Sequence, residues 1–374
     1  MSDVYLDHAA TTPMTRVALD AYVQAAQLHG NAASVHRAGQ KAREFLEEGR
    51  AAFAESIGAH PLTILANSGG TEGDNHVLLG AAKGRVGGHV VTSSIEHSAV
   101  LAAARELAAS GFDVTFLQPD RHGHVSPDAL RDALRPDTFL VSVHHANNEI
   151  GTVQDVARLA EVAHEGGALF HTDAVQSLGV LSVNVAEWNA DFATFSAHKW
   201  GGPKGVGFLY VRRGLELPPL MIGGGQEKGL RAGTHNVAGV YAAGLAALDA
   251  SRARPETFER MRALHARLEA HLRAAPNVTF NHPVDGSPKV LSVTASGADG
   301  EALLMNLDLM GVYASLGSAC SSGTTLPSHV LKALGLGDAD AKATVRFSFG
   351  RDSTLDDVDR AAEAYRQALE FSAL

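Results

Sequence analysis

The sequence is poor in cysteine, in positive charge and in long apolar runs, and each shortage excludes a class of protein. Cys320 is the one cysteine among 374 residues, which excludes an internal disulfide and a cysteine-built zinc site. The 31 Lys and Arg residues against 41 Asp and Glu residues give a formal charge of −10, which disfavours nucleic-acid binding. No apolar run approaches the roughly 20 residues of a membrane-spanning helix. We expect no direct nucleic-acid partner, no membrane and no metal.

The first residues lack the features of an export signal. Met1 to Asp7 contain acids where a secretory signal has cations and an apolar block, so we expect a cytoplasmic protein. The composition, 45% hydrophobic and 19% charged, is that of a folded globular chain. Its length is sufficient for two domains and a large core.

Short apolar runs alternate with longer segments of helical period, which is typical of an α/β fold around a mostly parallel sheet. Seven strands are predicted at 62–66, 89–93, 113–117, 139–144, 168–172, 191–195 and 207–211. Helices are predicted between them, for example at 98–110, 126–135 and 154–165.

The pattern changes in the last third of the chain. A long helical pattern runs from Asn236 to about Ala274, and Pro255 predicts a break or a kink within it. Strands are predicted at 277–281, 289–294 and 343–348, with helices near 299–310 and from about 354. We therefore expect a large domain of residues 14–254 and a smaller α+β domain of residues 255–374, to which residues 1–13 return.

The most informative stretch is SAHKWGGPKG at 196–205, which follows a predicted strand. A desolvated lysine amine, here Lys199, can form a Schiff base with an aldehyde such as that of pyridoxal phosphate. A surface lysine in a loop is the alternative, since the chain has eight lysines. The cofactor hypothesis therefore requires an acid for the pyridinium nitrogen, donors for the phosphate and a partner for the ring face.

Residues that meet these needs follow other strands, where ligands of an open α/β sheet bind. Asp173 follows the 168–172 strand, and a buried carboxylate there needs a cation such as a protonated pyridine, although it could also be a helix N-cap. The glycine-rich segment 67–75, with Gly70 and Thr71, suits a phosphate at a helix N-terminus, but a plain glycine turn gives the same pattern. The loop at 223–236 mixes glycines with Gln, Arg, Thr and His, which suits contact with an anion.

Histidines at strand ends are weaker signals, because the chain has 19 of them. His97 could stack on a planar ring or carry protons. His144 and His145 are adjacent and should point to opposite faces of a strand, which disfavours metal binding by the pair. The segment that contains Asn148 adds amide donors at the same edge of the sheet.

Two residues of the smaller domain also stand out. Cys320 lies among small and polar residues, an unusual setting for a core cysteine, so a nucleophilic thiol is the hypothesis and a buried apolar side chain the alternative. Arg346 lies between apolar strand residues, where an unpaired guanidinium would be costly. It could bind a ligand carboxylate with two donors, or pair with a structural acid.

Taken together, these motifs resemble the cysteine desulfurases of the nitrogen-fixation and iron–sulfur-cluster type, which are pyridoxal-phosphate enzymes of the class V aminotransferase group. The match spans nearly the entire chain in unchanged order. It rests on YLDHAATT at 5–12, SGGTEGDN at 68–75, Glu96-His97, NNEIGT at 147–152, HTDAVQ at 171–176, SAHKWGGPKG at 196–205, GGGQEKGLRAGT at 223–234, GSACSSG at 317–323 and VRFSFGR at 345–351.

The resemblance implies the fold of type I pyridoxal-phosphate enzymes and a role for each matching residue. Lys199 would form the Schiff base, Asp173 would pair with the pyridinium, Gln176 would bond the ring hydroxyl, and His97 would stack on the ring and move protons. The phosphate would be held by Gly70, Thr71, Ser196 and His198, with Thr234 supplied by the other subunit of a homodimer. Asn148 and Arg346 would bind the substrate.

The resemblance also implies the reaction. L-Cysteine would be converted to L-alanine, with its sulfur taken by Cys320 as a persulfide and passed to an acceptor protein for iron–sulfur cluster assembly, tRNA thiolation or both. Another enzyme of the same fold, such as an aminotransferase or a selenocysteine lyase, would share the Lys199 residues but not need Cys320. A non-catalytic scaffold on this fold is the remaining alternative.

Overall fold

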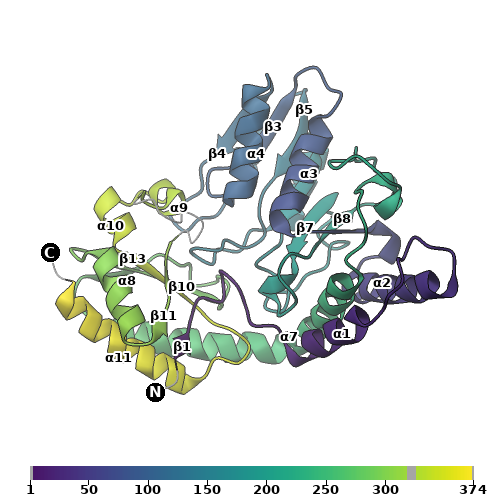
Figure 1. Ribbon diagram of the computed structural model, residues 1–374. Helices are drawn as coiled ribbons and strands as arrows, with labels where there is room; N and C mark the ends of the chain where they lie inside the picture. The colour runs from purple at the N-terminus through teal and green to yellow at the C-terminus, as the bar shows by residue number, and fades with distance from the viewer. Residues whose placement is uncertain (1–2, 318–325, 373–374) are drawn as a thin grey trace.

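The computed structural model describes residues 3–317 and 326–372, and it confirms the α/β fold with a mostly parallel seven-stranded sheet (Figure 1). The strand order of this sheet is β2-β8-β7-β6-β5-β3-β4. Only β8 runs antiparallel to its neighbours. The strands are β2 (Ile64–Asn67), β3 (His89–Ser93), β4 (Asp113–Leu117), β5 (Thr138–Ser142), β6 (Leu169–Asp173), β7 (Phe192–Ser196) and β8 (Gly207–Val211).

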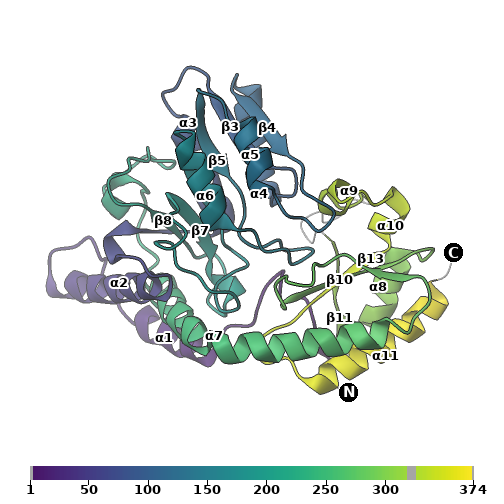
Figure 2. The same ribbon diagram turned by 180° about the vertical axis from the view of Figure 1, so that it is seen from behind.

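Helices cover both faces of this sheet because its central strands are apolar on both sides. Val90 and Leu140 pack toward α3 (Gly70–Ala82) and α4 (Ser98–Ala109) on one face. Their neighbours Val91 and Val141 pack on the other face toward α5 (Pro127–Ala133), α6 (Val156–Glu165) and α2 (Arg37–Ser56). The two views in Figures 1 and 2 show these two layers of helices on opposite sides of the sheet.

A second, smaller sheet lies beside the first and has its own core. Its order is β12-β13-β10-β9, with antiparallel neighbours throughout, and β1 pairs with β11 in parallel nearby. The helices α8 and α11 pack against it. The elements are β1 (Val4–Tyr5), β9 (Val278–Phe280), β10 (Val290–Ala295), α8 (Gly300–Leu309), β11 (Val312–Tyr313), β12 (Ser315–Leu316), β13 (Thr344–Ser348) and α11 (Leu355–Phe371).

One long helix, α7 (Val237–Leu272), connects the two parts of the molecule along its base (Figure 2). The break predicted at Pro255 is not found, because the helix continues through this residue. Before it, Val240, Ala243 and Ala250 belong to the core of the large sheet, whereas Met261 and Leu264 after it belong to the core of the small sheet. Because both ends of the helix are anchored in a core, the helix tolerates the loss of the backbone hydrogen bond that Pro255 cannot donate.

The remaining elements are short or lie at the surface of the large part. They are α1 (Arg16–Ala26), α9 (His329–Ala333), α10 (Asp338–Lys342) and three 3₁₀ turns at Pro61–Thr63, Ala197–Lys199 and Gln226–Gly229. Within residues 3–317 and 326–372, no helix has the length and apolar character needed to cross a membrane.

Candidate active site

A cavity of about 560 Å³ opens at the carboxyl ends of the large sheet, within the usual range for small-molecule sites. Ten of the twelve residues predicted for the site line it, although they come from many separate segments. They are Gly70, Thr71, His97, Asn148, Asp173, Gln176, Ser196, His198, Lys199 and Arg346. The other two are Thr234, which is exposed and does not line this cavity, and Cys320, which lies outside the described residues.

Lys199 reaches the cavity from the 3₁₀ turn that follows β7. Its Nζ donates hydrogen bonds to the backbone carbonyls of Ala9 at 2.5 Å and Ala10 at 2.7 Å. The N-terminal segment therefore returns to the large sheet and positions this amine. His198, the preceding residue, bonds Thr11 Oγ1 at 3.1 Å through Nδ1, and burial followed by the charge of Lys199 lowers the pKa of His198 to about 4. An imidazole with that pKa is neutral at physiological pH.

Asp173 ends β6 at the floor of the cavity, beside a second buried carboxyl, that of Asp74 on α3. Asp173 Oδ1 accepts a hydrogen bond from the backbone N–H of Val175 at 2.9 Å. Burial raises the pKa of both carboxyls, and for Asp74 the charge of Asp173 adds to that effect. Neither oxygen of Asp74 has a hydrogen-bond partner among the residues described. His171 Nε2 lies 3.7 Å from Asp74 Oδ1, too far for a hydrogen bond, so the described residues leave Asp74 without a proton donor.

His97 stands at the N-terminus of α4, where its Nδ1 accepts from the backbone N–H of Ala99 at 3.2 Å. Below it, the Glu96 side chain is fully buried and bonds His144 Nδ1 at 2.9 Å and the His144 backbone N–H. Burial acts to lower the pKa of His144, but the Glu96 carboxylate outweighs it, so the pKa is raised. His145 turns away toward Ser177, as predicted for adjacent residues.

The side of the cavity at the N-terminus of α3 has the features of a phosphate cradle. Gly70 and Thr71 begin this 13-residue helix, and Ser196 lies opposite. Gly69 has φ 145°, a conformation that favours glycine, and a Cβ there would lie 3.3 Å from Ser196 Oγ. The close approach leaves backbone N–H groups and hydroxyls at a positive helix end, which is the chemistry that binds an anion.

Gln176 is held from two sides, which fixes the direction of its amide. Its Nε2 donates to the Ala9 carbonyl at 2.9 Å, and its Oε1 accepts from Lys289 Nζ at 3.1 Å. In a flipped amide, Oε1 would face the Ala9 carbonyl oxygen and Nε2 would face Lys289 Nζ, so an acceptor would meet an acceptor and a donor a donor. Only the observed orientation therefore fits. The Lys289 side chain is buried, and burial followed by the charge of Lys199 lowers its pKa to about 7. Sequence reasoning missed Lys289, although a charge at the start of an apolar strand was a usable signal.

Arg346, on β13, is 1% exposed and already has an acidic partner. Its Nη2 donates to Asp7 Oδ1 at 2.7 Å and its Nη1 to the backbone carbonyl of Asn148 at 3.0 Å, while Nε has no partner among the residues described. The structural acid considered as the alternative for Arg346 is therefore present. Sequence reasoning assigned Asp7 no role, because 339 residues separate it from Arg346.

Comparison with known proteins agrees with this geometry. The profile of the family described as Aminotransferase class-V matches residues 4–361. A putative cysteine desulfurase IscS 1 of Bacillus subtilis (strain 168) is 42% identical over 370 residues, covering 97% of each chain. The solved structure of a NifS-like protein superposes with a TM-score of 0.93 at 33% identity, covering 99% of this chain and 100% of that one. The structure titled SspA in complex with cysteine gives 0.83 at 34% identity, with 94% and 99% covered.

The chain belongs to the class-V aminotransferase family, whose cofactor is pyridoxal phosphate. Within that family it belongs with the cysteine desulfurases, as the resemblance of its motifs predicted. The residues present suit this cofactor: the buried Asp173 needs a cationic ring nitrogen nearby, and the start of α3 offers an anion site.

Proposed function

We propose that the protein removes sulfur from L-cysteine with pyridoxal phosphate bound in the 560 Å³ cavity, and carries that sulfur as a persulfide on Cys320. The observation that supports this most is the meeting of Lys199, Asp173 and Gln176 at one cavity, although they come from different segments. An amine, an acid and an amide of fixed direction are the groups that a pyridoxal ring requires.

The residues that would hold the cofactor follow from their position and chemistry. Lys199 Nζ would bond its aldehyde, Asp173 would face the ring nitrogen, and Gln176 would donate its second amide hydrogen to the ring oxygen, with His97 over the ring. The phosphate would be bound by Gly70, Thr71, Ser196 and His198, and by Thr234 of the partner subunit.

When bound, pyridoxal phosphate supplies an electron sink for the charge left on the substrate Cα after loss of its proton. Lys199 Nζ is the base proposed to remove that proton, and His97 is proposed to carry protons at the ring face. The pKa of Asp173, raised by burial and by the charge of Glu96, would fall once a cationic ring nitrogen lay beside it. An ionised Asp173 then keeps that nitrogen protonated.

Arg346 and Asn148 are proposed to bind the substrate, with the guanidinium of Arg346 on its carboxylate. Both terminal nitrogens of Arg346 are engaged in the structure, one with Asp7 and one with the Asn148 carbonyl. The substrate carboxylate would therefore replace the carboxylate of Asp7 at Nη2, or it would bind Nε, which has no hydrogen-bond partner among the described residues. Exchange of like partners avoids leaving the buried guanidinium unpaired, which would be costly.

Cys320 completes the reaction as proposed from the family resemblance, since it lies outside the described residues. Its thiolate attacks the sulfur of bound L-cysteine, the new S–S bond makes a persulfide, and the substrate Cβ–S bond breaks. The three-carbon remainder gains a proton at Cβ and leaves as L-alanine, so atoms and electrons balance. The persulfide would pass to an acceptor protein for iron–sulfur cluster assembly or tRNA thiolation.

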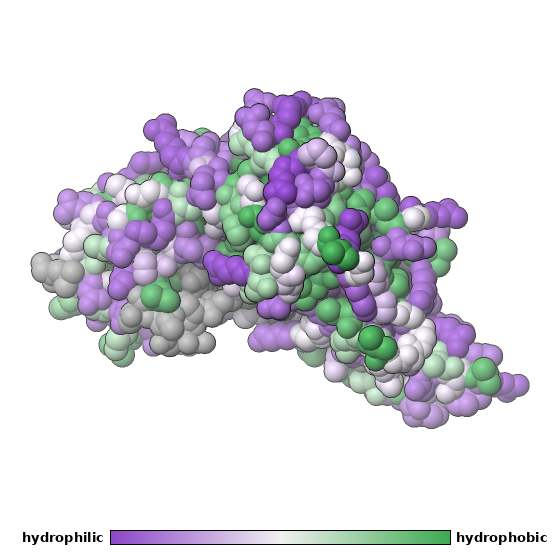
Figure 3. Space-filling model, turned by 90° about the horizontal axis from the view of Figure 1, so that it is seen from above, coloured by the Kyte–Doolittle hydropathy of each residue, from purple (hydrophilic) through white to green (hydrophobic). Residues whose placement is uncertain are grey.

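The proposal includes a homodimer in the cytoplasm, built from a large domain of residues 14–254 and a small domain of residues 1–13 and 255–374. Two separate cores joined by α7 support this division. The exposed apolar residues of α1 (Val17, Leu19, Tyr22 and Val23), 37% to 50% exposed, support a partner surface. From above, hydrophobic patches lie between hydrophilic side chains (Figure 3).

The test combines a spectrum with product analysis. The purified protein loaded with pyridoxal phosphate should absorb in the near-visible range, and borohydride should abolish the band. Cys320→Ala should keep the band but lose sulfide release from L-cysteine, whereas Lys199→Ala should lose both. Undiminished sulfide release by Cys320→Ala would refute the role of Cys320, and a protein that pyridoxal phosphate cannot colour would refute the cofactor.

A further inference from the structure

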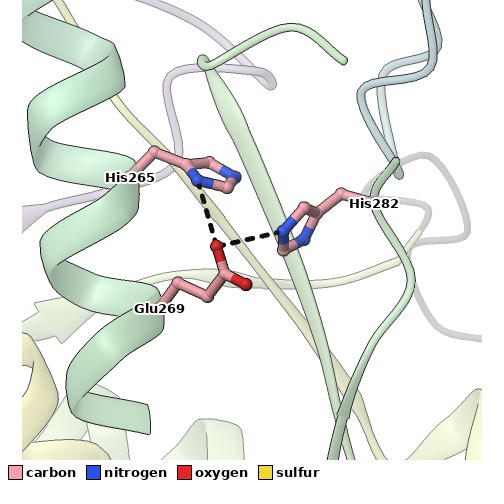
Figure 4. A group of neighbouring side chains, drawn as sticks. All are labelled: His265, Glu269 and His282. Carbon is pink, nitrogen blue, oxygen red and sulfur yellow. Dashed lines mark ion pairs between the residues drawn. The ribbon is translucent and has the colours of Figure 1, made fainter. Parts of the chain in front are cut away.

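A second group of chemically active side chains lies outside the cavity, on the half of α7 that faces the small sheet (Figure 4). His265 and Glu269 are one helical turn apart on α7, and His282 follows β9. Glu269 Oε2 lies 3.8 Å from His265 Nδ1 and 3.6 Å from His282 Nε2. The three side chains converge on one point, with their ligand atoms all within 4.8 Å of one another.

The bonding of His265 leaves a nitrogen lone pair directed at that point. His265 Nε2 contacts the Val290 carbonyl at 3.1 Å, and because a carbonyl can only accept, this nitrogen carries the hydrogen. Its Nδ1 then presents a lone pair to the Glu269 carboxylate. In the neutral ring, this lone pair and a carboxylate oxygen with no hydrogen between them repel one another.

His282 gives an independent indication that a ligand is needed. Its side chain is only 7% exposed, its Nδ1 is buried without a partner among the described residues, and the 3.6 Å contact of its Nε2 is too long for a hydrogen bond. A buried imidazole whose Nε2 makes no hydrogen bond is costly unless something absent from the protein chain completes it.

The dimensions fit a metal ion. Bonds of about 2.0–2.1 Å to a tetrahedral zinc ion place neighbouring ligand atoms about 3.4 Å apart, close to the 3.6 and 3.8 Å between Glu269 Oε2 and the two imidazoles. The carbonyl of Val290 orients His265 as outer partners of metal-binding histidines do. Arg273 binds Glu269 Oε1 and so leaves Oε2 for the cation. Two imidazoles with one carboxylate favour zinc and neighbouring transition metals over magnesium or calcium.

We propose that His265, Glu269 and His282 bind one divalent transition-metal ion, such as Zn²⁺, with water in the open coordination position. The ion would join α7 to the segment that leads into β10, where Lys289 contacts Gln176 in the cavity. The site does not depend on the desulfurase reaction. It would stabilise the junction between the long helix and the small sheet.

The test is a titration of the metal-free holoenzyme with Co²⁺, followed by visible absorption, and with Zn²⁺ in competition with a coloured chelator. Pyridoxal phosphate is kept bound because Asp74, His97 and Asp173 could otherwise offer a second cation site. We expect one equivalent of Co²⁺ per chain and the absorption of a four-coordinate ion. Glu269→Gln and His282→Ala should each weaken binding by about 100-fold or more.

Two controls separate this site from others. His271→Ala removes an exposed histidine of the same helix, which contacts Asp359 at 3.1 Å, and should leave the affinity unchanged. Cys320→Ala should also bind normally, which excludes the thiol as a ligand. Zn²⁺ should raise the Tm of the parent protein but not of Glu269→Gln. Absence of saturable binding, or equal affinity in Glu269→Gln, His282→Ala and the parent, would overturn the proposal.

Discussion

Two buried carboxyls, Asp74 and Asp173, lie side by side in the cavity. Changing each of them to asparagine in turn tests whether their roles differ. Asp74→Asn replaces a side chain whose pKa is already raised by burial and by Asp173, so it mimics the protonated form. Asp173→Asn removes the charge that a ring nitrogen would need. We expect alanine formation from L-cysteine to fall by about 100-fold or more in Asp173→Asn.

The matched variant Asp74→Asn should lose less than about tenfold, because the raised pKa already favours an uncharged side chain at this position. Both variants keep the size of the side chain, so cavity volume is controlled. The absorption spectrum of each loaded variant measures whether the cofactor is still bound. Equal losses of alanine formation in the two variants would contradict the assignment of Asp173 to the ring nitrogen.

Lys289 predicts a dependence of stability on pH. Its pKa falls from 10.5 to about 7 on folding, mainly through burial. Below pH 7 Lys289 is charged in both the folded and the unfolded chain, so burial of the charge destabilises the folded protein in full. Between pH 7 and 10.5 only the unfolded chain is protonated, so this destabilisation declines as the pH rises. A tenfold change in proton affinity corresponds to about 1.4 kcal/mol, so the cost is at most about 5 kcal/mol.

Lys289→Met should therefore raise the free energy of unfolding of the cofactor-free protein at pH 6.5, and the gain should shrink by pH 9.5. Loss of the bond to Gln176 offsets about 1 kcal/mol of it. Denaturant unfolding at the two pH values measures the difference. Lys83→Met, which changes the lysine directly after α3 whose Nζ contacts the Pro219 carbonyl at the surface, serves as the control. A gain that did not decrease with pH would contradict the argument.

At the level of elements, α2 and α7 cross so closely that glycine is required on both. A Cβ on Gly244 would lie 1.9 Å from the backbone oxygen of Gly49, and one on Gly49 would lie 2.6 Å from Tyr241 Cα. Helix propensity alone predicts that Gly244→Ala stabilises α7 by about 1 kcal/mol. The crossing predicts the opposite sign, a loss of about 2–3 kcal/mol from overpacking.

The sign of the change in the free energy of unfolding therefore decides between the two effects. Denaturant titration of Gly244→Ala measures it, and Glu48→Ala, an exposed change next to Gly49 on α2, should alter stability by less than about 0.5 kcal/mol. A stabilised Gly244→Ala would mean that the helices can separate without cost.

Apolar runs predicted the elements of the large sheet well, and contacts between distant segments were not predictable. The segment Phe192–Ser196 was predicted to within one residue because it is buried on both faces. Asp7 with Arg346 and Lys289 with Gln176 depend on how separate segments return to one cavity, which no local pattern encodes. The continuity of α7 through Pro255 was missed for a related reason, since its two ends are fixed by two cores.

For the whole molecule, the proposed dimer makes a prediction about which chain supplies Thr234. This residue is exposed and absent from the cavity of its own chain, yet family resemblance assigns it to the phosphate. A Lys199→Ala chain has no amine, and a Thr234→Ala chain should bind pyridoxal phosphate weakly at limiting concentration. If Thr234 acts across the interface, a mixed dimer of these two chains has one intact site, formed by the Lys199 of one and the Thr234 of the other.

Equal amounts of the two variants, unfolded and reassociated together, should therefore regain about a quarter of the parental alanine formation, because half of the dimers are mixed and each has one working site of two. If Thr234 acted within its own chain, every site of the mixed dimer would lack a residue, and activity would stay at the mean of the two variants. Each variant reassociated alone is the control, and the parent treated in the same way sets the scale. Recovery above that mean requires an interface that carries a phosphate ligand from one chain to the other.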